Sequence, residues 1–467
     1  PDMWFAGKAI NYYWFGHFYT AVATRLSTLP SYITYNLMIA TILGLTANGV
    51  FSIVGTLVAS LPKKFAGKAV AAGLLSVLLV CFAGNLHTPI YVYQNGLDKY
   101  WYPEATRFIG YNPETNDKTI HEFPIYSFVV SDLHAHLLGI PLVILFLGLL
   151  WNIASAKEEM PFLKKLKSLI LPGLILGSMF MTNTWDFGSY LIAAAAAIFF
   201  LKIIPGRFSW NKLMHAFFET AVSLSILFVV GIITALPFIL NFSAMTQGIK
   251  LVHSHTPFWR LAVLWGFPAI LTLIFIPLMV FGLRKKIKKA DIFVFSLLIA
   301  SWVLIAIPEI IYVKDIYIAS HYRANTMFKI TYQAYVMFYL SAGYIALRTV
   351  TKIKKIVLKI FSTTFFTLLF TALFIYPFIA VNSYYNRLQE YKGLNGEVWL
   401  KTIYPDIYGT VLWFRDNVSG QPTILEAAGD SYTDYNVISS YTGLPTVEGW
   451  FVHEWLWRGG SDAPADR

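Results

Sequence analysis

Long apolar segments divide this chain, and they constrain its fold more than any other feature. About ten can be drawn, at residues 35–61, 69–84, 137–154, 169–181, 187–204, 217–240, 261–283, 292–307, 328–347 and 360–381. A helix needs about 20 residues to cross a bilayer, so the shorter segments must borrow flanking residues or tilt. With 57% hydrophobic and 13% charged residues, the chain is far too apolar for a soluble protein of 467 residues. The pattern predicts an all-α polytopic membrane protein with about ten transmembrane helices.

The positive charge is concentrated in loops between these segments. Residues 63–68, 157–167, 202–212, 284–289 and 348–359 hold 20 of the 36 lysines and arginines. A strictly alternating path through the membrane places all five basic loops on one side, as the positive-inside rule requires of the cytoplasm. The net charge of +11 therefore reflects membrane topology and gives no reason to expect a nucleic-acid partner.

The same path assigns five longer segments to the external side: residues 1–34, 86–136, 241–260, 308–327 and 382–467. Nine of the ten histidines fall on that side, which predicts a functional site there. Residues 1–381 form the predicted transmembrane domain, and residues 382–467 form a small α/β segment with a strand at 423–425. The topology also predicts a further helix before Pro1 and a truncated C-terminal segment. The single cysteine, Cys81, allows no disulfide within the chain.

Asp2 lies in the first external segment, ahead of an aromatic run, NYYWFGH, at residues 11–17. Such rings suit the lipid headgroup zone, so an interfacial helix is one interpretation. An acid directly outside a membrane helix can also act as a base or a metal ligand. Asp2 is therefore a candidate catalytic residue, and Asn11 and His17 are further candidates.

A run of acid and imidazole groups, SDLHAH, opens the third apolar segment at residues 131–136. Asp132, His134 and His136 are ordinary ligands of a divalent metal such as Mg²⁺ or Mn²⁺, or partners of a substrate. A helix cap with hydrogen-bonded histidines explains the same residues without a ligand. Asp186, in the turn between two apolar segments, suits the positive end of a helix dipole and is a weaker candidate.

The strongest motif is HYRANTMFK at residues 321–329, which approaches the outer membrane edge. Arg323 and Lys329 can hold a phosphate, with His321 beside them. Snorkelling of both side chains to lipid headgroups is the alternative. Glu309 and Asn325 are additional candidates in the same loop.

The C-terminal segment carries acids and aromatic rings in close sequence. Glu448, His453, Glu454 and Arg458 are the candidates there. This composition suits sugar recognition but also ordinary folding, and it contains no nucleotide-binding loop spacing.

Together these motifs resemble the uncharacterised "YYY" multi-pass membrane proteins of bacteria and archaea. The resemblance rests on DMWFAG at 2–7, NYYWFGH at 11–17, SDLHAH at 131–136, NTWDFG at 183–188, HYRANTMFK at 321–329, LEAAGDSY at 425–432, TGLPTVEGW at 442–450 and HEWLWR at 453–458. It covers essentially the whole chain, although the third ring of the name-giving motif is Trp14 instead of tyrosine. It implies a multi-pass protein in the plasma membrane of a bacterium or archaeon, with its functional face outside.

That family is in turn distantly similar to the GT-C glycosyltransferases, which transfer a sugar from a polyprenyl-phosphate donor. This similarity implies a GT-C-like fold, with Asp2 as base or metal ligand and Arg323 with Lys329 as holders of the donor phosphate. It predicts a membrane glycosyltransferase whose partners are the lipid bilayer and a polyprenyl-phosphate-linked sugar. The alternatives are a transporter or flippase for a lipid or polysaccharide, and a non-catalytic scaffold of a cell-surface polymer assembly.

Overall fold

The computed structural model describes residues 2–62, 67–156, 162–283, 286–315, 317, 319–390 and 393–467. Every predicted apolar segment is helical, because only a helix satisfies its own backbone hydrogen bonds inside a bilayer. Among the described residues, seven helices are long and apolar enough to cross a membrane. They are α2 (Ser31–Ala59), α6 (Ala135–Ser155), α9 (Thr184–Ile203), α10 (Trp210–Ile239), α11 with the π-helix η3 (Phe258–Leu283), α12 (Lys289–Ile310) and α14 with α15 (Ile356–Tyr384).

The predicted count of about ten spans is slightly high. Helices α3 (Ala69–Phe82) and α4 (His87–Asn95) meet at 61° and provide an eighth span only if taken together. Helix α8 (Ile170–Thr182) is short, and α13 (Ala324–Lys352) is 29 residues long but carries polar side chains such as Lys329 and Gln333. The basic loops are only partly described, since residues 63–66, 157–161, 284 and 285 lie outside the described part.

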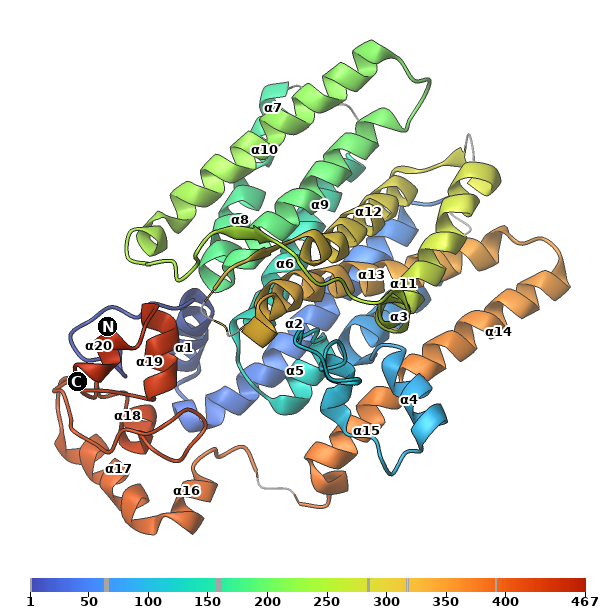
Figure 1. Ribbon diagram of the computed structural model, residues 1–467. Coiled ribbons are helices and arrows are strands. Elements are labelled where there is room, and N and C mark those ends of the chain that lie inside the picture. The colour runs from blue at the N-terminus through green and yellow to red at the C-terminus, as the bar shows by residue number, and fades with distance from the viewer. Residues whose placement is uncertain are drawn as a thin grey trace.

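Helix α13 is the centre of the bundle. It packs against α12, α3, α9, α2 and α11 (Figure 1). Nearly all of its side chains are buried. The close approach of α3 depends on Gly343, since a Cβ atom there would lie 2.5 Å from the Ala72 carbonyl oxygen and from Ser76 Oγ. Deeper along α13, Arg348 Nε and Nη2 donate to the two carboxylate oxygens of Asp291 on α12, at 2.7 and 2.8 Å.

We expect Gly343→Ala to lower the free energy of unfolding by about 1–3 kcal/mol, because the added methyl group forces α3 and α13 apart. The matched control is Gly55→Ala on α2, where an added Cβ meets no atom within 4 Å. Thermal unfolding of the purified protein in one detergent measures both variants. Equal stability of the two would show that α3 does not pack against α13 at this position.

The remaining elements connect the spans or form the C-terminal segment. They are α1 (Phe15–Ser27), η2 (Tyr102–Thr106), α5 (Pro124–Val130), α7 (Phe162–Ser168), η5 (Ala319–His321), η6 (Asn386–Leu388), α16 (Val398–Ile403), α17 (Pro405–Asn417), α18 (Val437–Thr442), α19 (Phe451–Arg458) and α20 (Asp462–Ala465). Strands β1 (Ile249–Leu251) and β2 (Ile311–Val313) pair antiparallel and join two of the predicted external loops.

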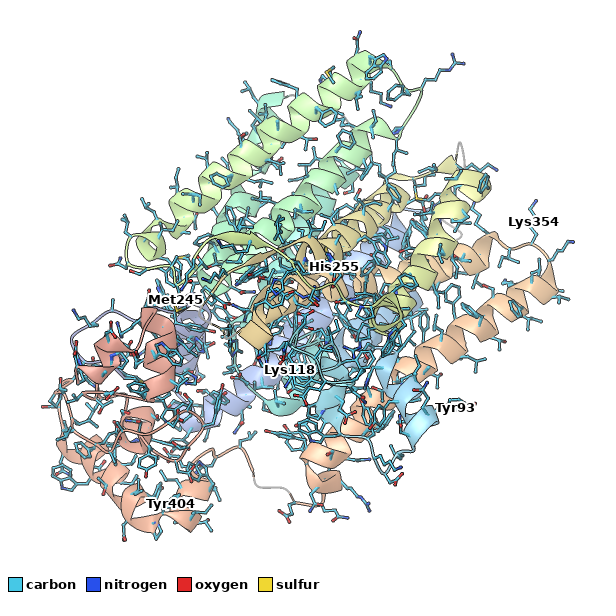
Figure 2. All side chains as sticks on the ribbon, in the orientation of Figure 1. Tyr93, Lys118, Met245, His255, Lys354 and Tyr404 are labelled. Atoms are coloured by element: carbon cyan, nitrogen blue, oxygen red, sulfur yellow. The ribbon has the colours of Figure 1, made fainter. Side chains whose placement is uncertain are left out.

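The regular elements of the C-terminal segment are helices, and the strand predicted at 423–425 is present only as a parallel bridge between Ile424 and Thr446. This segment packs against the beginning of the chain, beside α1 (Figure 1). The Thr446 amide donates to the Met3 carbonyl at 2.8 Å, and the Ala6 amide donates to the Thr446 carbonyl at 3.0 Å. In Figure 2, Lys354 of a basic loop lies far from Met245 and Tyr404, which belong to two of the predicted external segments.

Candidate functional site

His134 is the centre of a hydrogen-bonded array at the predicted external end of the bundle. It precedes α6 with an extended backbone, so its ring projects away from the helix start. Its Nδ1 lies 3.1 Å from Asp132 Oδ2, and its Nε2 lies 2.9 Å from the Tyr12 hydroxyl. If Nδ1 carries the proton for the carboxylate, Nε2 accepts a proton from a hydroxyl group. The side chains of His134 and Asp132 are 37% and 59% exposed, so a ligand can reach them.

The carboxylate of Asp132 is suited to orient this imidazole. Partial burial acts to raise the pKa of Asp132, but the hydrogen bond with His134 and nearby positive charge, including that of Lys329, lower it below its ordinary value overall. Asp132 therefore stays ionised at neutral pH and holds the ring in one tautomer.

His136 and Lys329 lie on one side of His134. The rings of His134 and His136 are 5.0 Å apart, and His136 in turn lies 4.8 Å from the ring of Phe328. His136 Nε2 approaches the Ser127 hydroxyl at 3.1 Å, whereas its buried Nδ1 has no partner. Lys329 Nζ lies 4.6 Å from the Phe328 ring centroid, is buried, and has no hydrogen-bond acceptor. The acids whose charges act on it are Glu122, Asp186 and Asp132.

Asp186 is buried deeper, at the start of α9. Its Oδ1 accepts from Asn183 Nδ2 and from Gln333 Nε2, both at 2.7 Å, while its Oδ2 has no partner. The carboxylate therefore joins α9 to α13 and faces the interior of the bundle rather than open solvent.

Arg323 is fully buried in a separate ion-pair network. Its Nε and Nη2 donate to Asp117 at 2.9 and 2.6 Å, and its Nη1 donates to the Pro308 carbonyl and lies 3.0 Å from Glu309 Oε2. Every guanidinium nitrogen is thus committed to the protein, and the side chain is 0% exposed. This arrangement does not fit the predicted role of Arg323 in holding a donor phosphate, and it separates Arg323 from Lys329.

The other candidates of this loop also bond to protein groups. His321 Nδ1 lies 3.0 Å from Ser320 Oγ, and Asn325 Nδ2 donates to Asp315 Oδ2 at 3.2 Å. Glu309 accepts from the Thr256 hydroxyl at 2.6 Å in addition to its ion pair with Arg323. The structure therefore brings Lys329, and not the whole motif, to the site around His134.

Asp2 lies in a buried cluster that attaches the C-terminal segment. Its Oδ2 accepts from Arg458 Nη2 at 2.7 Å and its Oδ1 accepts from the Trp4 amide at 2.9 Å. Arg458 Nε also donates to Glu454 Oε2 at 2.8 Å, so one cation serves two acids. Asn11 strengthens the same junction, because its side-chain amide donates to the Ser243 and Trp457 carbonyls. Both Asp2 oxygens are occupied, which favours a positioning role.

Three further candidates are placed around this junction. His453 Nδ1 lies 2.6 Å from Ser431 Oγ, Glu448 Oε1 is buried without a partner, and His17 is exposed on α1.

The attachment of α19 is expected to weaken as pH rises. Burial, and next the charge of Asp2, raise the pKa of Glu454 from 4.5 to about 7. A raised pKa in the folded state means that the stabilisation is complete below about pH 4.5 and is lost as pH rises through 7. Hydrogen exchange of residues 451–458 should therefore speed up roughly a hundredfold relative to intrinsic rates between pH 5 and 8. Glu454→Gln should flatten this dependence, and a wild-type slope in that variant would contradict the assignment.

The three residues named as candidate metal ligands, Asp132, His134 and His136, do not gather into one ligand set. Among the described residues, no three His, Cys, Asp or Glu side chains gather in a way that could hold a metal ion. Both ring nitrogens of His134 have protein partners, and His136 approaches Ser127 instead of Asp132. The residues present therefore do not fit Mg²⁺ or Mn²⁺.

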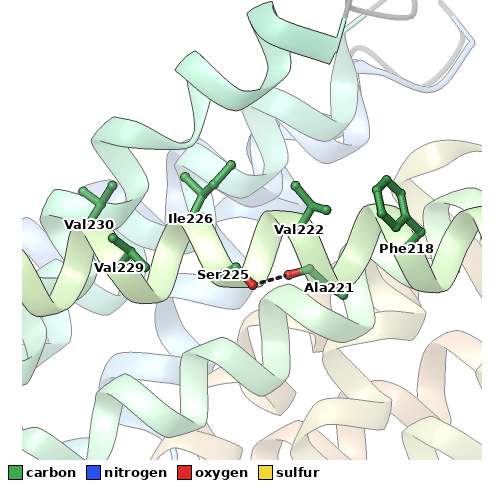
Figure 3. A pocket seen from close by; sticks show the side chains of 7 residues that line it. All are labelled: Phe218, Ala221, Val222, Ser225, Ile226, Val229 and Val230. Carbon is green, nitrogen blue, oxygen red and sulfur yellow. Dashed lines mark hydrogen bonds between the residues drawn. The ribbon is translucent and has the colours of Figure 1, made fainter.

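A shallow groove along α10 is almost entirely apolar, unlike the polar site around His134 (Figure 3). It is lined by residues such as Phe218, Val222 and Val229, and its one hydroxyl, on Ser225, donates to the Ala221 carbonyl. Such a surface suits contact with lipid and offers no reactive group.

The sequence did not single out several residues of the site. Glu122, Ser127 and Asp117 have no motif around them, and their contacts with α6 and α13 appear only in the fold. Tyr12 lies in the aromatic run and could have been chosen as a polar ring beside the membrane edge.

Comparison with known proteins identifies a family, and the chain also has a distant likeness to a solved structure. A model of the family described as uncharacterised membrane protein (DUF2298) matches residues 1–280 and 269–338. The oligosaccharyltransferase of Archaeoglobus fulgidus, solved with a tethered acceptor peptide, superposes with a TM-score of 0.46 at 10% identity. The superposition covers 93% of this chain and 55% of that chain, so this chain spans about half of that enzyme's length. A search of curated proteins finds no match.

Proposed function

We propose that this chain, which belongs to the DUF2298 family of membrane proteins, is a glycosyltransferase that uses a polyprenyl-phosphate-linked sugar on the external face of the plasma membrane. In this proposal Lys329 holds the donor phosphate. His134, oriented by Asp132, is the general base for the acceptor hydroxyl.

The observation that carries the proposal is the ammonium group of Lys329, which is buried without a hydrogen-bond acceptor. Burying an ionised group without hydrogen bonds is costly, and in a membrane protein such a group marks a functional site by default. Lys329 lies one helical turn and a half inside α13, at the predicted outer membrane edge where the phosphate of a lipid carrier resides. The unpartnered Nδ1 of His136 offers a second polar contact nearby.

The geometry around His134 supplies the second half of the reaction. The acceptor hydroxyl takes the place of the Tyr12 hydroxyl and gives its proton to His134 Nε2. The acceptor oxygen forms a bond to C1 of the donor sugar as the bond between C1 and the phosphate oxygen breaks. The phosphate leaves with the bonding electrons, and Lys329 stabilises its charge. His134 then releases the proton to solvent.

Native mass spectrometry of the protein extracted with its lipids tests the donor site. We expect a polyprenyl-phosphate lipid, with or without its sugar, to co-purify with the wild type and to be lost from Lys329→Met. Lys314→Met is the matched control, because Lys314 is an exposed lysine of the predicted external loop that precedes α13. Retention of the lipid by Lys329→Met, or equal loss from both variants, would remove Lys329 from the donor site.

A transporter or flippase is the second candidate, and the buried Asp186 favours it. Asp186, Asn183 and Gln333 form a polar cluster between α9 and α13, where transport proteins place ionisable groups. Flux of a fluorescent polyprenyl-phosphate across liposomes separates the two functions. A transporter moves the lipid and loses flux in Asp186→Ala, whereas a transferase shows no flux in either form.

A further inference from the structure

Six aromatic rings from the two ends of the chain meet beside the proposed site. They form an aromatic cluster made of Trp4, Tyr12, Tyr432, Trp450, His453 and Trp457. The first two belong to the first segment and the others to the C-terminal segment, which is attached through the Arg458 ion pairs.

The inner part of the aromatic cluster is a stack. Trp457 lies nearly parallel to Trp4, with ring centroids 6.2 Å apart and an interplanar angle of 14°. It also stacks on Tyr12, at 5.2 Å and 25°. His453 meets the edge of Trp457 at 5.7 Å, so the four rings fix one another's orientation.

The outer part of the cluster is open to solvent and has polar edges. The side chain of Tyr432 is 87% exposed, and its ring lies 5.8 Å from Trp450 and 5.5 Å from His453. Ser431 bonds to His453, and the exposed carboxylate of Asp430 lies next to it in the chain. Aromatic faces stack on the C–H faces of sugar rings, while hydroxyl, imidazole and carboxylate groups bond to sugar hydroxyls. A surface for lipid chains would present aliphatic side chains instead.

Tyr12 connects the aromatic cluster to His134. Tyr12 stacks on Trp457 and donates its hydroxyl toward His134, whereas His136, Phe328 and Lys329 follow on from His134 through separate contacts. His134, the proposed base, therefore lies between Lys329, the proposed donor cation, and the aromatic cluster. A molecule bound on the cluster would present a hydroxyl to His134 from the side away from the donor phosphate.

We propose that the aromatic cluster binds the acceptor, and that the acceptor is an oligosaccharide. The enzyme then extends a sugar chain, and the acceptor sugars nearest the site lie on Tyr432 and Trp450, in the open part of the cluster. The role of the bound oligosaccharide as the acceptor rests on the proposed function. Its binding to the aromatic cluster does not depend on Lys329.

Saturation-transfer NMR and calorimetry on the full chain in lipid nanodiscs test it, with cellotetraose, mannotetraose and chitotetraose as probes. We expect at least one tetrasaccharide to bind, and Tyr432→Ala to weaken its binding about tenfold through loss of ring stacking. The matched control is Tyr93→Ala, which removes an equally exposed tyrosine, 91% exposed, from α4 outside the cluster. Lys329→Met should bind the tetrasaccharide like the wild type.

The outcomes separate the two proposals. If no tetrasaccharide binds, or if Tyr432→Ala binds as tightly as Tyr93→Ala, the acceptor proposal is overturned. If Tyr432→Ala weakens binding while Lys329→Met keeps its lipid phosphate, the aromatic cluster stands and the donor site of the proposed function fails. Loss of tetrasaccharide binding in Lys329→Met would also contradict a separate acceptor site.

Discussion

Replacement of His134 by alanine is expected to lower the rate of sugar transfer by about 10²–10⁴-fold while the protein still binds the donor lipid. This is the usual contribution of a positioned general base. His134 is the only described histidine with a carboxylate on one ring nitrogen and a hydroxyl on the other, the arrangement that accepts a proton from an alcohol. The rate is measured with the lipid-linked sugar that co-purifies with the wild type, in a single-turnover reaction.

The control for this experiment is His17→Ala. His17 is exposed on α1, and its charge acts on Asp132, yet it lies outside the hydrogen-bonded array. The base assignment requires a large loss in His134→Ala and little change in His17→Ala. The rate of Asp132→Asn should lie between those of the two histidine variants, because the imidazole of His134 loses its orienting carboxylate but keeps the nitrogen that accepts the proton. Equal rates for the two histidine variants would refute the assignment.

The helices could be predicted because the membrane leaves few alternatives. A segment such as residues 217–240 has one charged residue, Glu219 near its start, and must form its backbone hydrogen bonds within itself, and it is helical in α10. The number of spans was harder to predict, because α13 combines buried polar groups with apolar ones. Its central position depends on the helices that pack around it, and hydropathy contains no information about them.

The site was only partly predictable, for a reason visible at Asp132 and Arg323. Asp132 and His134 are two residues apart, so their pairing follows from local sequence. The partner of Arg323 is Asp117, 206 residues away, and the partner of Arg458 is Asp2, 456 residues away. An arginine destined for a buried ion pair and one destined for a phosphate look alike until the acids are placed. The same long-range placement created the aromatic cluster.

Arg323→Met is expected to lower the free energy of unfolding by about 3–5 kcal/mol, because it leaves the buried Asp117 and the partly buried Glu309 without their cation. Lys329→Met should lower stability less, because that ammonium interacts with Glu122, Asp186 and Asp132 through their charges but has no hydrogen bond to lose. Chemical denaturation in one detergent compares the two variants, and native mass spectrometry reports their bound lipid. A stable Arg323→Met protein that has lost the lipid phosphate would reverse the assignment and return the donor site to Arg323. A destabilised Arg323→Met protein that keeps its lipid would show that the two cations of this short motif differ in role. Arg323 would stabilise the fold, and Lys329 would remain the candidate for binding the donor phosphate.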